Sequence, residues 1–274
     1  MSVAMEADRS AKPSPQWQPR SAADRIARSV IYIAAVIAII WSIRTIEVIP
    51  EFLYDAPAQT YDLFSRMWPF DWSRFWSAIW PAMIETFHIA TLGTLLALIL
   101  SLPLAFLAAQ NFNSNVFLAW VAKFIFVSTR SVNSLVWALL FVAILGPGPL
   151  AGVLAIAFRS IGFVGKLFGE ALEDAKRGPI EALTATGAPR ALVLIKGYWP
   201  QVEPAFWSVA FLRWDINIRE SAVLGLVGAG GIGVALDASL ENLYWDEVGL
   251  ILALILVVVI FAEVLTSWIR SRII

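Results

Sequence analysis

Four arginines lie within long apolar stretches of this sequence, where a charged side chain is costly. They are Arg130, Arg159, Arg213 and Arg219. A charge at the centre of a bilayer costs at least ~2.5–3.5 kcal/mol on insertion scales, so such residues normally face a cavity or a partner. The guanidinium group stays charged and offers a fixed fork of N–H donors that matches the oxygens of a small oxyanion. We therefore expect an anion path through a membrane.

Two asparagines near these arginines, Asn133 and Asn217, add neutral donors to the expected path. A path must hold its anion weakly enough to release it, so tight capture would belong to a separate external binding protein. Structural pairing is the alternative. Asp215 and Arg219 stand four apart and can pair, and Arg213 can meet an acid of a neighbouring span, whereas Arg159 has no nearby acid in its own helix.

The stretch GLVGAGGIG places glycines at the G-x-G-x-x-G spacing of a dinucleotide site, so a membrane-bound dehydrogenase is one hypothesis. That fingerprint needs a preceding strand and an acid about 20 residues on. Here the glycines follow a long apolar segment that contains charged residues, and the position about 20 residues further on lies in the apolar run ILALILVVVI, which has no acid. We expect backbones to approach closely here and some residues to take positive φ. The glycines concerned are Gly228, Gly230, Gly231 and Gly233.

His88 and Glu85 stand three apart in another apolar stretch. A proton relay is one interpretation, and a hydrogen-bonded interior pair is the one we favour. His88 is the single histidine and the chain has no cysteine, which excludes an H-E-x-x-H zinc site, disulfides and thiolate catalysis.

The composition is that of a membrane protein: 59% of the residues are hydrophobic and 15% are charged. Soluble domains average about 45–50% apolar and about 25% charged residues. The net charge of −1 and the lack of a basic face give no support for nucleic-acid binding. The 13 tryptophans suit the headgroup level of a bilayer.

The apolar runs predict an all-α protein with six membrane spans. Residues 1–28 are expected to form a tail, 29–49 a first span of roughly 20 residues, and 50–80 an amphipathic segment on the outer surface. The first span is expected to be retained, because no small-residue cleavage site follows it. A core over 81–269 supplies five more spans, and 270–274 follow the last of them. Those spans are expected at 83–109, with a kink at Pro103, and at 131–145, 150–168, 205–226 and 248–269, with 116–130 on the inner surface.

Lysines and arginines are distributed unequally between the two sides. The tail, the loop 169–200 with its flank and the C-terminus hold twelve of them, and the opposite side holds Arg44, Arg66 and Arg74. Because cytoplasmic loops carry the excess of positive charge, both termini and the loop 169–200 are expected in the cytoplasm.

The loop 169–200 contains PIEALTATG, which predicts a short helix. Glu181 would lie beside the positive end of the helix dipole, Gly187 would cap its C-terminus, and Pro189 would prevent continuation. The helix exposes small side chains against which another protein can pack. A linker helix lying on the membrane is the alternative.

This loop resembles the E-A-A-x3-G…P coupling helix by which permease subunits of binding-protein-dependent ABC importers dock into the ATPase subunit. Leu183 stands where that family usually has alanine. The positions concerned are Glu181, Ala182, Leu183, Gly187, Ala188 and Pro200. RSVNSLVWALLFVAILGPGPLAGVLAIAFRSIGFVGKLFGEALED and INIRESAVLGLVGAGGIG resemble the phosphonate/phosphite-type permeases, over about two thirds of the chain. That subfamily often shows R-S-I-P-E-L where this chain has RSVNSL.

The resemblance implies the type I importer fold and inward transport of a phosphorus oxyanion across a bacterial inner membrane. It also implies the partners: a second copy of this chain, two cytoplasmic ATP-binding subunits and a periplasmic substrate-binding protein. Six spans are few to enclose a path, which also favours a dimer. The chain lacks G-x-x-x-x-G-K-[ST], so ATP and magnesium are expected on the partner, with no cofactor and no enzyme activity here. The alternative is an ATP-independent secondary transporter or channel.

Overall fold

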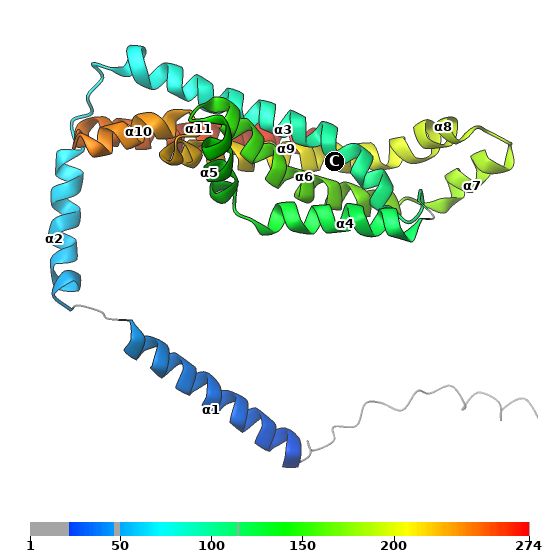
Figure 1. Cartoon of the computed structure of the whole chain (residues 1–274), viewed down its shortest axis with the longest axis horizontal. Helices are drawn as coiled ribbons and strands as arrows, with labels where there is room; N and C mark the ends of the chain where they lie inside the picture. The colour runs from blue at the N-terminus through cyan, green and yellow to red at the C-terminus, as the bar shows by residue number, and fades with distance from the viewer. Residues whose placement is uncertain (1–21, 47–49, 114, 274) are drawn as a thin grey trace, which may run out of the picture. The chain divides into compact units, whose positions relative to one another are not determined.

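The computed structural model describes residues 22–46, 50–113 and 115–273, and these residues form helices and turns without any strand (Figure 1). Four helices are long and apolar enough to cross a membrane by themselves: Ile26–Thr45, Phe75–Ala108, Pro149–Glu173 and Trp245–Arg272. Two bent helix pairs raise the number to six if each pair crosses once. The expected all-α architecture is confirmed.

The chain divides after Gln59 into two compact units. The first contains α1 (Ala22–Thr45), whose large apolar side chains from Ile26 onward are exposed, and most of α2 (Pro50–Arg66). Helix α1 begins earlier than the expected start at 29, so the residues just before the apolar run are also helical. Asp24 in the first turn stabilises this start, because its negative charge lies near the positive N-terminal end of the helix dipole. Of the expected tail 1–28, residues 1–21 lie outside the described part.

The expected surface segment 50–80 ends sooner than predicted. A π-helical turn at Phe75–Ile79 runs directly into α3 (Trp80–Ala108), so the span begins at Phe75. The turn before it is held by Asp71, whose carboxylate accepts hydrogen bonds from the Ser73 hydroxyl at 2.7 Å and the Ser73 N–H at 2.8 Å. Both hydrogen bonds lower the pKa of the Asp71 carboxyl, and the bond from the Ser73 hydroxyl has the larger effect.

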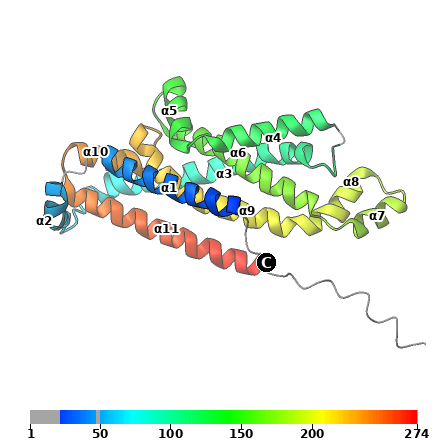
Figure 2. The same cartoon turned by 90° about the horizontal axis from the view of Figure 1, so that it is seen from below.

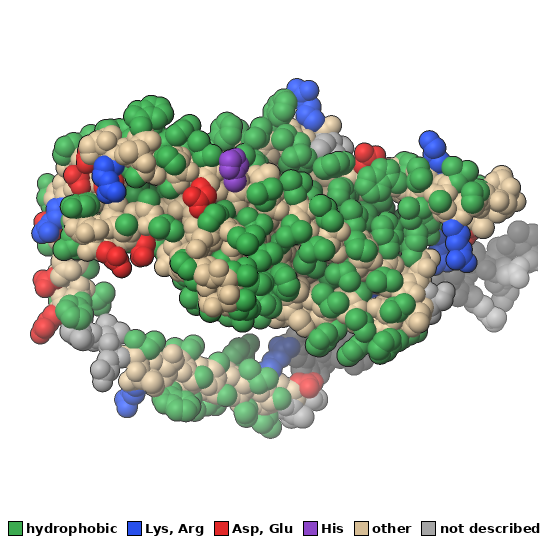
Figure 3. Space-filling view, turned by 45° about the horizontal axis from the view of Figure 1, so that its top comes forward, with side chains coloured by type: hydrophobic (Ala, Val, Ile, Leu, Met, Phe, Trp, Pro, Cys, Tyr) green, Lys and Arg blue, Asp and Glu red, His purple; other side chains and the backbone are tan. Residues whose placement is uncertain are grey.

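The core of the second unit is built around α6 (Pro149–Glu173), which lies beside α3 and α9 (Trp199–Leu224) in both views (Figures 1 and 2). Its buried face carries small residues that allow close backbone approach: Ala151, Gly152, Ala155, Ser160, Gly162, Gly165 and Gly169. Helix α11 (Trp245–Ile273) packs on α9 and continues past the expected end at 269. Hydrophobic side chains cover most of the molecular face in Figure 3, as expected in a bilayer.

The prediction for residues 116–145 was wrong in its arrangement. Helix α4 (Val116–Ser131) runs along α6 and packs on it, and α5 (Ser134–Leu145) turns away from α4 by 92° (Figure 1). The expected surface segment 116–130 therefore lies alongside α6, and the expected span from residue 131 is a 12-residue helix nearly perpendicular to α4. Val132 is extended, and the Asn133 side chain caps α5 by accepting the Leu135 N–H at 3.1 Å. A cap of this kind fixes a helix start at the bend.

Candidate functional site

Glu220 on α9 is held between two arginines from different helices. Arg159 of α6 donates to Glu220 Oε1, and Arg213, two turns before Glu220 on α9, donates to Oε2 at 3.5 Å. The side chain of Arg213 is 4% exposed, that of Glu220 15% and that of Arg159 30%. We call these three residues the Arg–Glu cluster. It carries a net charge of +1 within the membrane-spanning bundle.

A chain of buried hydrogen bonds connects the Arg–Glu cluster to α3. Arg213 Nε donates to Ser160 Oγ at 2.8 Å, and Ser160 Oγ donates to Asn217 Oδ1 at 3.3 Å. Asn217 Nδ2 in turn donates to Thr94 Oγ1 on α3 at 2.7 Å. Asn217 is fully buried, and both ends of its amide are used. Its place in the structure is therefore a support for Arg213 and not the wall of an open cavity.

The other expected path residues lie around the Arg–Glu cluster. Asn133 reaches it indirectly, because its Oδ1 accepts from Ser134 Oγ at 3.3 Å and Ser134 Oγ accepts from Arg159 at 3.3 Å. Arg219 pairs with Asp215, which confirms the expected i, i+4 pair, and its side chain is 47% exposed. Arg213 pairs with an acid of its own helix, where we expected an acid of a neighbouring span. Arg159, which has no nearby acid in its own helix, pairs with Glu220 of α9.

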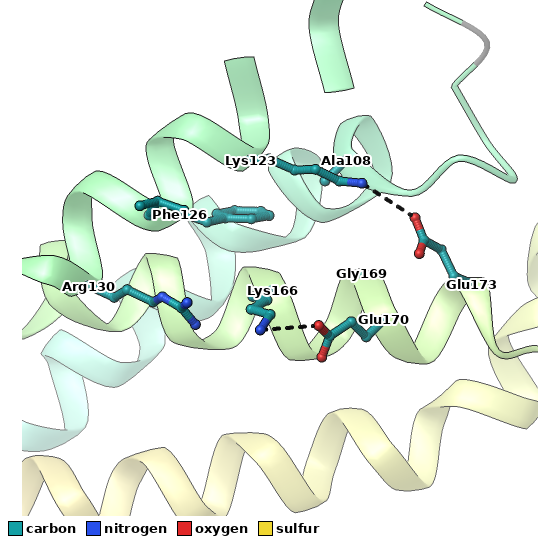
Figure 4. Close-up of a pocket in the computed structure, with 9 residues that line it drawn as sticks. Ala108, Lys123, Phe126, Arg130, Lys166, Gly169, Glu170 and Glu173 are labelled. Atoms are coloured by element: carbon teal, nitrogen blue, oxygen red, sulfur yellow. Dashed lines mark ion pairs between the residues drawn. The ribbon is translucent and has the colours of Figure 1, made fainter. Parts of the chain in front are cut away.

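Arg130 lines a separate pocket between α4 and α6. Figure 4 shows Lys123 and Arg130 from α4 facing Lys166, Glu170 and Glu173 from α6. Dashed lines mark the ion pairs Lys123–Glu173 at 4.0 Å and Lys166–Glu170 at 3.3 Å. In the part of the chain that the structure describes, Arg130 forms neither a hydrogen bond nor an ion pair.

The glycine segment forms a turn between α9 and α10 (Ile232–Glu241), with φ of +81° at Gly228, +83° at Gly230 and +78° at Gly231. Gly233 packs against the backbone of Gly225 so closely that a Cβ would collide with it. The prediction of close approach and positive φ is confirmed. The described residues on either side are helical, whereas the dinucleotide fingerprint requires a strand.

Two side chains of α3 fix this turn. Glu85 Oε1 accepts the Gly231 N–H at 3.1 Å, and Thr86 Oγ1 accepts the Ile232 N–H at 2.6 Å. The expected pair of Glu85 with His88 is therefore wrong: Glu85 is used by the turn, and His88 is exposed. A cavity of about 480 Å³ beside the turn is lined by Arg74, Glu85 and Glu247, among others.

The loop after α6 projects at one end of the second unit (Figures 1 and 2). Helix α7 (Arg177–Ala185) is followed by Gly187 with φ of +77°, where the Ala188 N–H donates to the Leu183 carbonyl at 3.4 Å. The predicted helix and its glycine cap are confirmed. Glu181, Ala182 and Gly187 are exposed, Leu183 and Ala188 are half-buried, and Pro200 lies in the first turn of α9.

The sequence reasoning missed the residues that connect helices. Arg213 and Glu220 stand seven apart, and that spacing on one helix face was a usable signal. Ser134, Ser160, Thr86 and Thr94 carried no such signal, because their partners lie on other helices. The described acidic and histidine side chains form no group of three suited to a metal ion.

Comparison with known proteins gives consistent results. Residues 101–273 match the family described as binding-protein-dependent transport system inner membrane component. The chain is 41% identical over 204 residues to the phosphite transport system permease protein PtxC of Stutzerimonas stutzeri, covering 74% of each chain. It is 35% identical to the phosphate-import permease protein PhnE of Mycolicibacterium smegmatis, covering 92% of this chain and 47% of that longer one.

The fold is that of solved ABC importers. The inward-facing MetNI methionine ABC transporter superimposes with a TM-score of 0.62 at 21% identity, covering 74% of this chain and 99% of the other. An amino acid ABC transporter crystallised with histidines also gives 0.62, at 20% identity, covering 73% and 95%. The chain therefore belongs to the binding-protein-dependent transport system inner membrane components, as a multi-pass permease subunit of a bacterial ABC importer.

Proposed function

We propose that this permease moves a phosphorus oxyanion, such as phosphite or a phosphonate, inward across the inner membrane. The observation that carries the proposal is the Arg–Glu cluster, in which two guanidinium groups from α6 and α9 share one carboxylate. A phosphorus oxyanion presents oxygens that guanidinium forks bind in the same way. The names of the relatives, a phosphite permease and a phosphate-import permease, agree with this cargo.

Glu220 acts in this proposal as a stand-in for the cargo. A buried arginine without a counter-charge is strongly destabilising, so the carboxylate keeps Arg213 neutralised while the path is empty. An arriving oxyanion takes the place of Glu220 on Arg159, the more exposed of the two arginines. Because cargo and carboxylate compete for the same donors, the anion is held weakly enough to leave again.

The partners follow from the family. We propose a homodimer of this chain, two ATP-binding subunits that hold ATP and magnesium, and a periplasmic binding protein that captures the cargo; this chain itself binds no cofactor. The exposed helix α7, with Glu181, Ala182 and Gly187, is the proposed contact with the ATPase. This arrangement requires α7 and both termini in the cytoplasm. The excess of lysine and arginine in the tail, the loop 169–200 and the C-terminus supports that orientation.

The test is ATP-driven uptake of phosphite and methylphosphonate into vesicles holding the assembled complex. Arg159→Ala and Arg213→Ala are expected to abolish uptake while the subunits still co-purify. Arg66→Ala, which removes an exposed arginine paired with Asp62 on α2, is the matched control and is expected to transport normally. Transport at the wild-type rate in both cluster variants would contradict the proposal.

A further inference from the structure

The pocket between α4 and α6 is a second site suited to an anion. Its volume is about 370 Å³, within the range of small-molecule sites. Its charged lining consists of Lys123, Arg130, Lys166, Glu170 and Glu173, which together carry a net charge of +1. Ala108, at the end of α3, also lines it, so the pocket lies toward the end of the bundle that carries the α7 loop (Figure 1).

The cations of this pocket are available to a ligand. Arg130 has no hydrogen-bonding or ionic partner within the described ranges. The two lysines have carboxylate partners, but the side chains of Lys123 and Lys166 are 50% and 45% exposed. Ion pairs at such exposed positions contribute only about 0–1 kcal/mol, so an incoming anion can replace the carboxylates at little cost.

Close helix packing gives the pocket a fixed shape. The ring of Phe126 lies against Gly165 and the backbone of Phe126 lies against Gly162, and a Cβ at either glycine would collide with it. Arg130 is one turn beyond Phe126 on α4, and Lys166 follows Gly165 on α6. The same glycines that bring the helices together therefore hold Arg130 and Lys166 across from each other (Figure 4).

The pocket also continues the line of the Arg–Glu cluster. Arg159, Lys166, Glu170 and Glu173 follow one another on α6 at intervals of seven, four and three residues, which places them along one helix face. From this geometry we infer that the pocket is a second, inner binding site for the phosphorus oxyanion, occupied after the anion leaves Arg159 and before it is released into the cytoplasm. This inference rests on the proposed function. Two weak sites in series also suit a cargo that must move on.

The absence of cysteine from the chain permits a direct test. Val127→Cys places one thiol in the pocket lining, at a position that is 54% exposed. In the purified complex with its ATPase, the rate of modification by a negatively charged methanethiosulfonate is followed as phosphite is added. We expect phosphite to protect the thiol. Adding Arg130→Gln is expected to weaken that protection about 10-fold, because a hydrogen bond to a charged group is lost.

Four further measurements make the result decisive. Lys166→Gln in the same Val127→Cys background is expected to weaken protection as well, and Arg66→Gln, which changes an exposed arginine elsewhere, is expected to leave it unchanged. Protection by phosphatidylglycerol vesicles and not by phosphite would identify a lipid headgroup as the ligand and overturn the inference. Equal protection with and without the Arg130 guanidinium would overturn it too. Wild-type uptake of phosphite, measured alongside, separates these failures from a failure of the proposed function.

Discussion

Gly231 is a position at which a single added methyl group should be poorly tolerated. Its φ of +78° and ψ of −169° lie in a region that only glycine occupies readily, and such a conformation costs about 1–3 kcal/mol in another residue. An added Cβ would also stand 2.6 Å from Thr86 Oγ1, the atom that accepts the Ile232 N–H. Displacing that hydroxyl removes a hydrogen bond worth about 1 kcal/mol. We expect Gly231→Ala to destabilise the folded subunit by about 2–4 kcal/mol.

The assay is thermal unfolding of the purified subunit in detergent. Size-exclusion chromatography after each heating step measures how much of the subunit remains folded. Since 1 kcal/mol corresponds to roughly 2–4 °C in a chain of 150–250 residues, Gly231→Ala should lower the melting temperature by roughly 4–16 °C. Gly228→Ala is the matched control: its φ is +81°, but the nearest atom to an added Cβ, on Pro147, is 3.5 Å away. Only the left-handed strain of about 1–2 kcal/mol remains there. Equal losses in the two variants would refute the contribution of the Thr86 contact.

Three further predictions address the contacts around the path and the loop. Asn217→Leu should lower the melting temperature, because it removes the two hydrogen bonds of Asn217 with the buried Ser160 and Thr94 hydroxyls, each worth about 1 kcal/mol; an unchanged melting temperature would contradict this. Glu85→Gln keeps an oxygen that can accept the Gly231 N–H and should retain uptake, whereas Glu85→Ala should reduce it; similar uptake by both variants would show that the hydrogen bond is unimportant. Glu181→Ala should weaken co-purification of the ATPase without a change in melting temperature, because Glu181 is exposed; an ATPase yield equal to wild type would remove Glu181 from the proposed contact.

The features that the sequence predicted well are those with a local cause. The positive φ at Gly230 and Gly231 and the cap at Gly187 follow from the conformational freedom of glycine. The Asp215–Arg219 pair follows from helical spacing alone. In each case the partner atoms lie within a few residues of one another, so no knowledge of the fold was needed.

The features that could not be predicted depend on which helices meet. In a membrane protein the surface that faces lipid is as apolar as the buried surface, so hydrophobic periodicity does not reveal which face of a helix is inside. For this reason the packing of α4 along α6 and the use of Glu85 by the glycine turn were not foreseen. The burial of Asn217 also depends on Thr94, which is distant in the sequence.

The glycine-rich face of α6 limits how this subunit can move. Gly152 lies against the backbone of Ala229, Gly162 against that of Phe126, and Gly93 of α3 against Ile156 of α6. A helix in backbone contact with its neighbours on several sides cannot rotate about its own axis without losing those contacts together. We therefore expect α3, α4, α6 and the glycine turn to move together, with opening and closing concentrated outside these contacts. The break at Val132 between α4 and α5 lies outside these contacts and is the hinge that we expect to move.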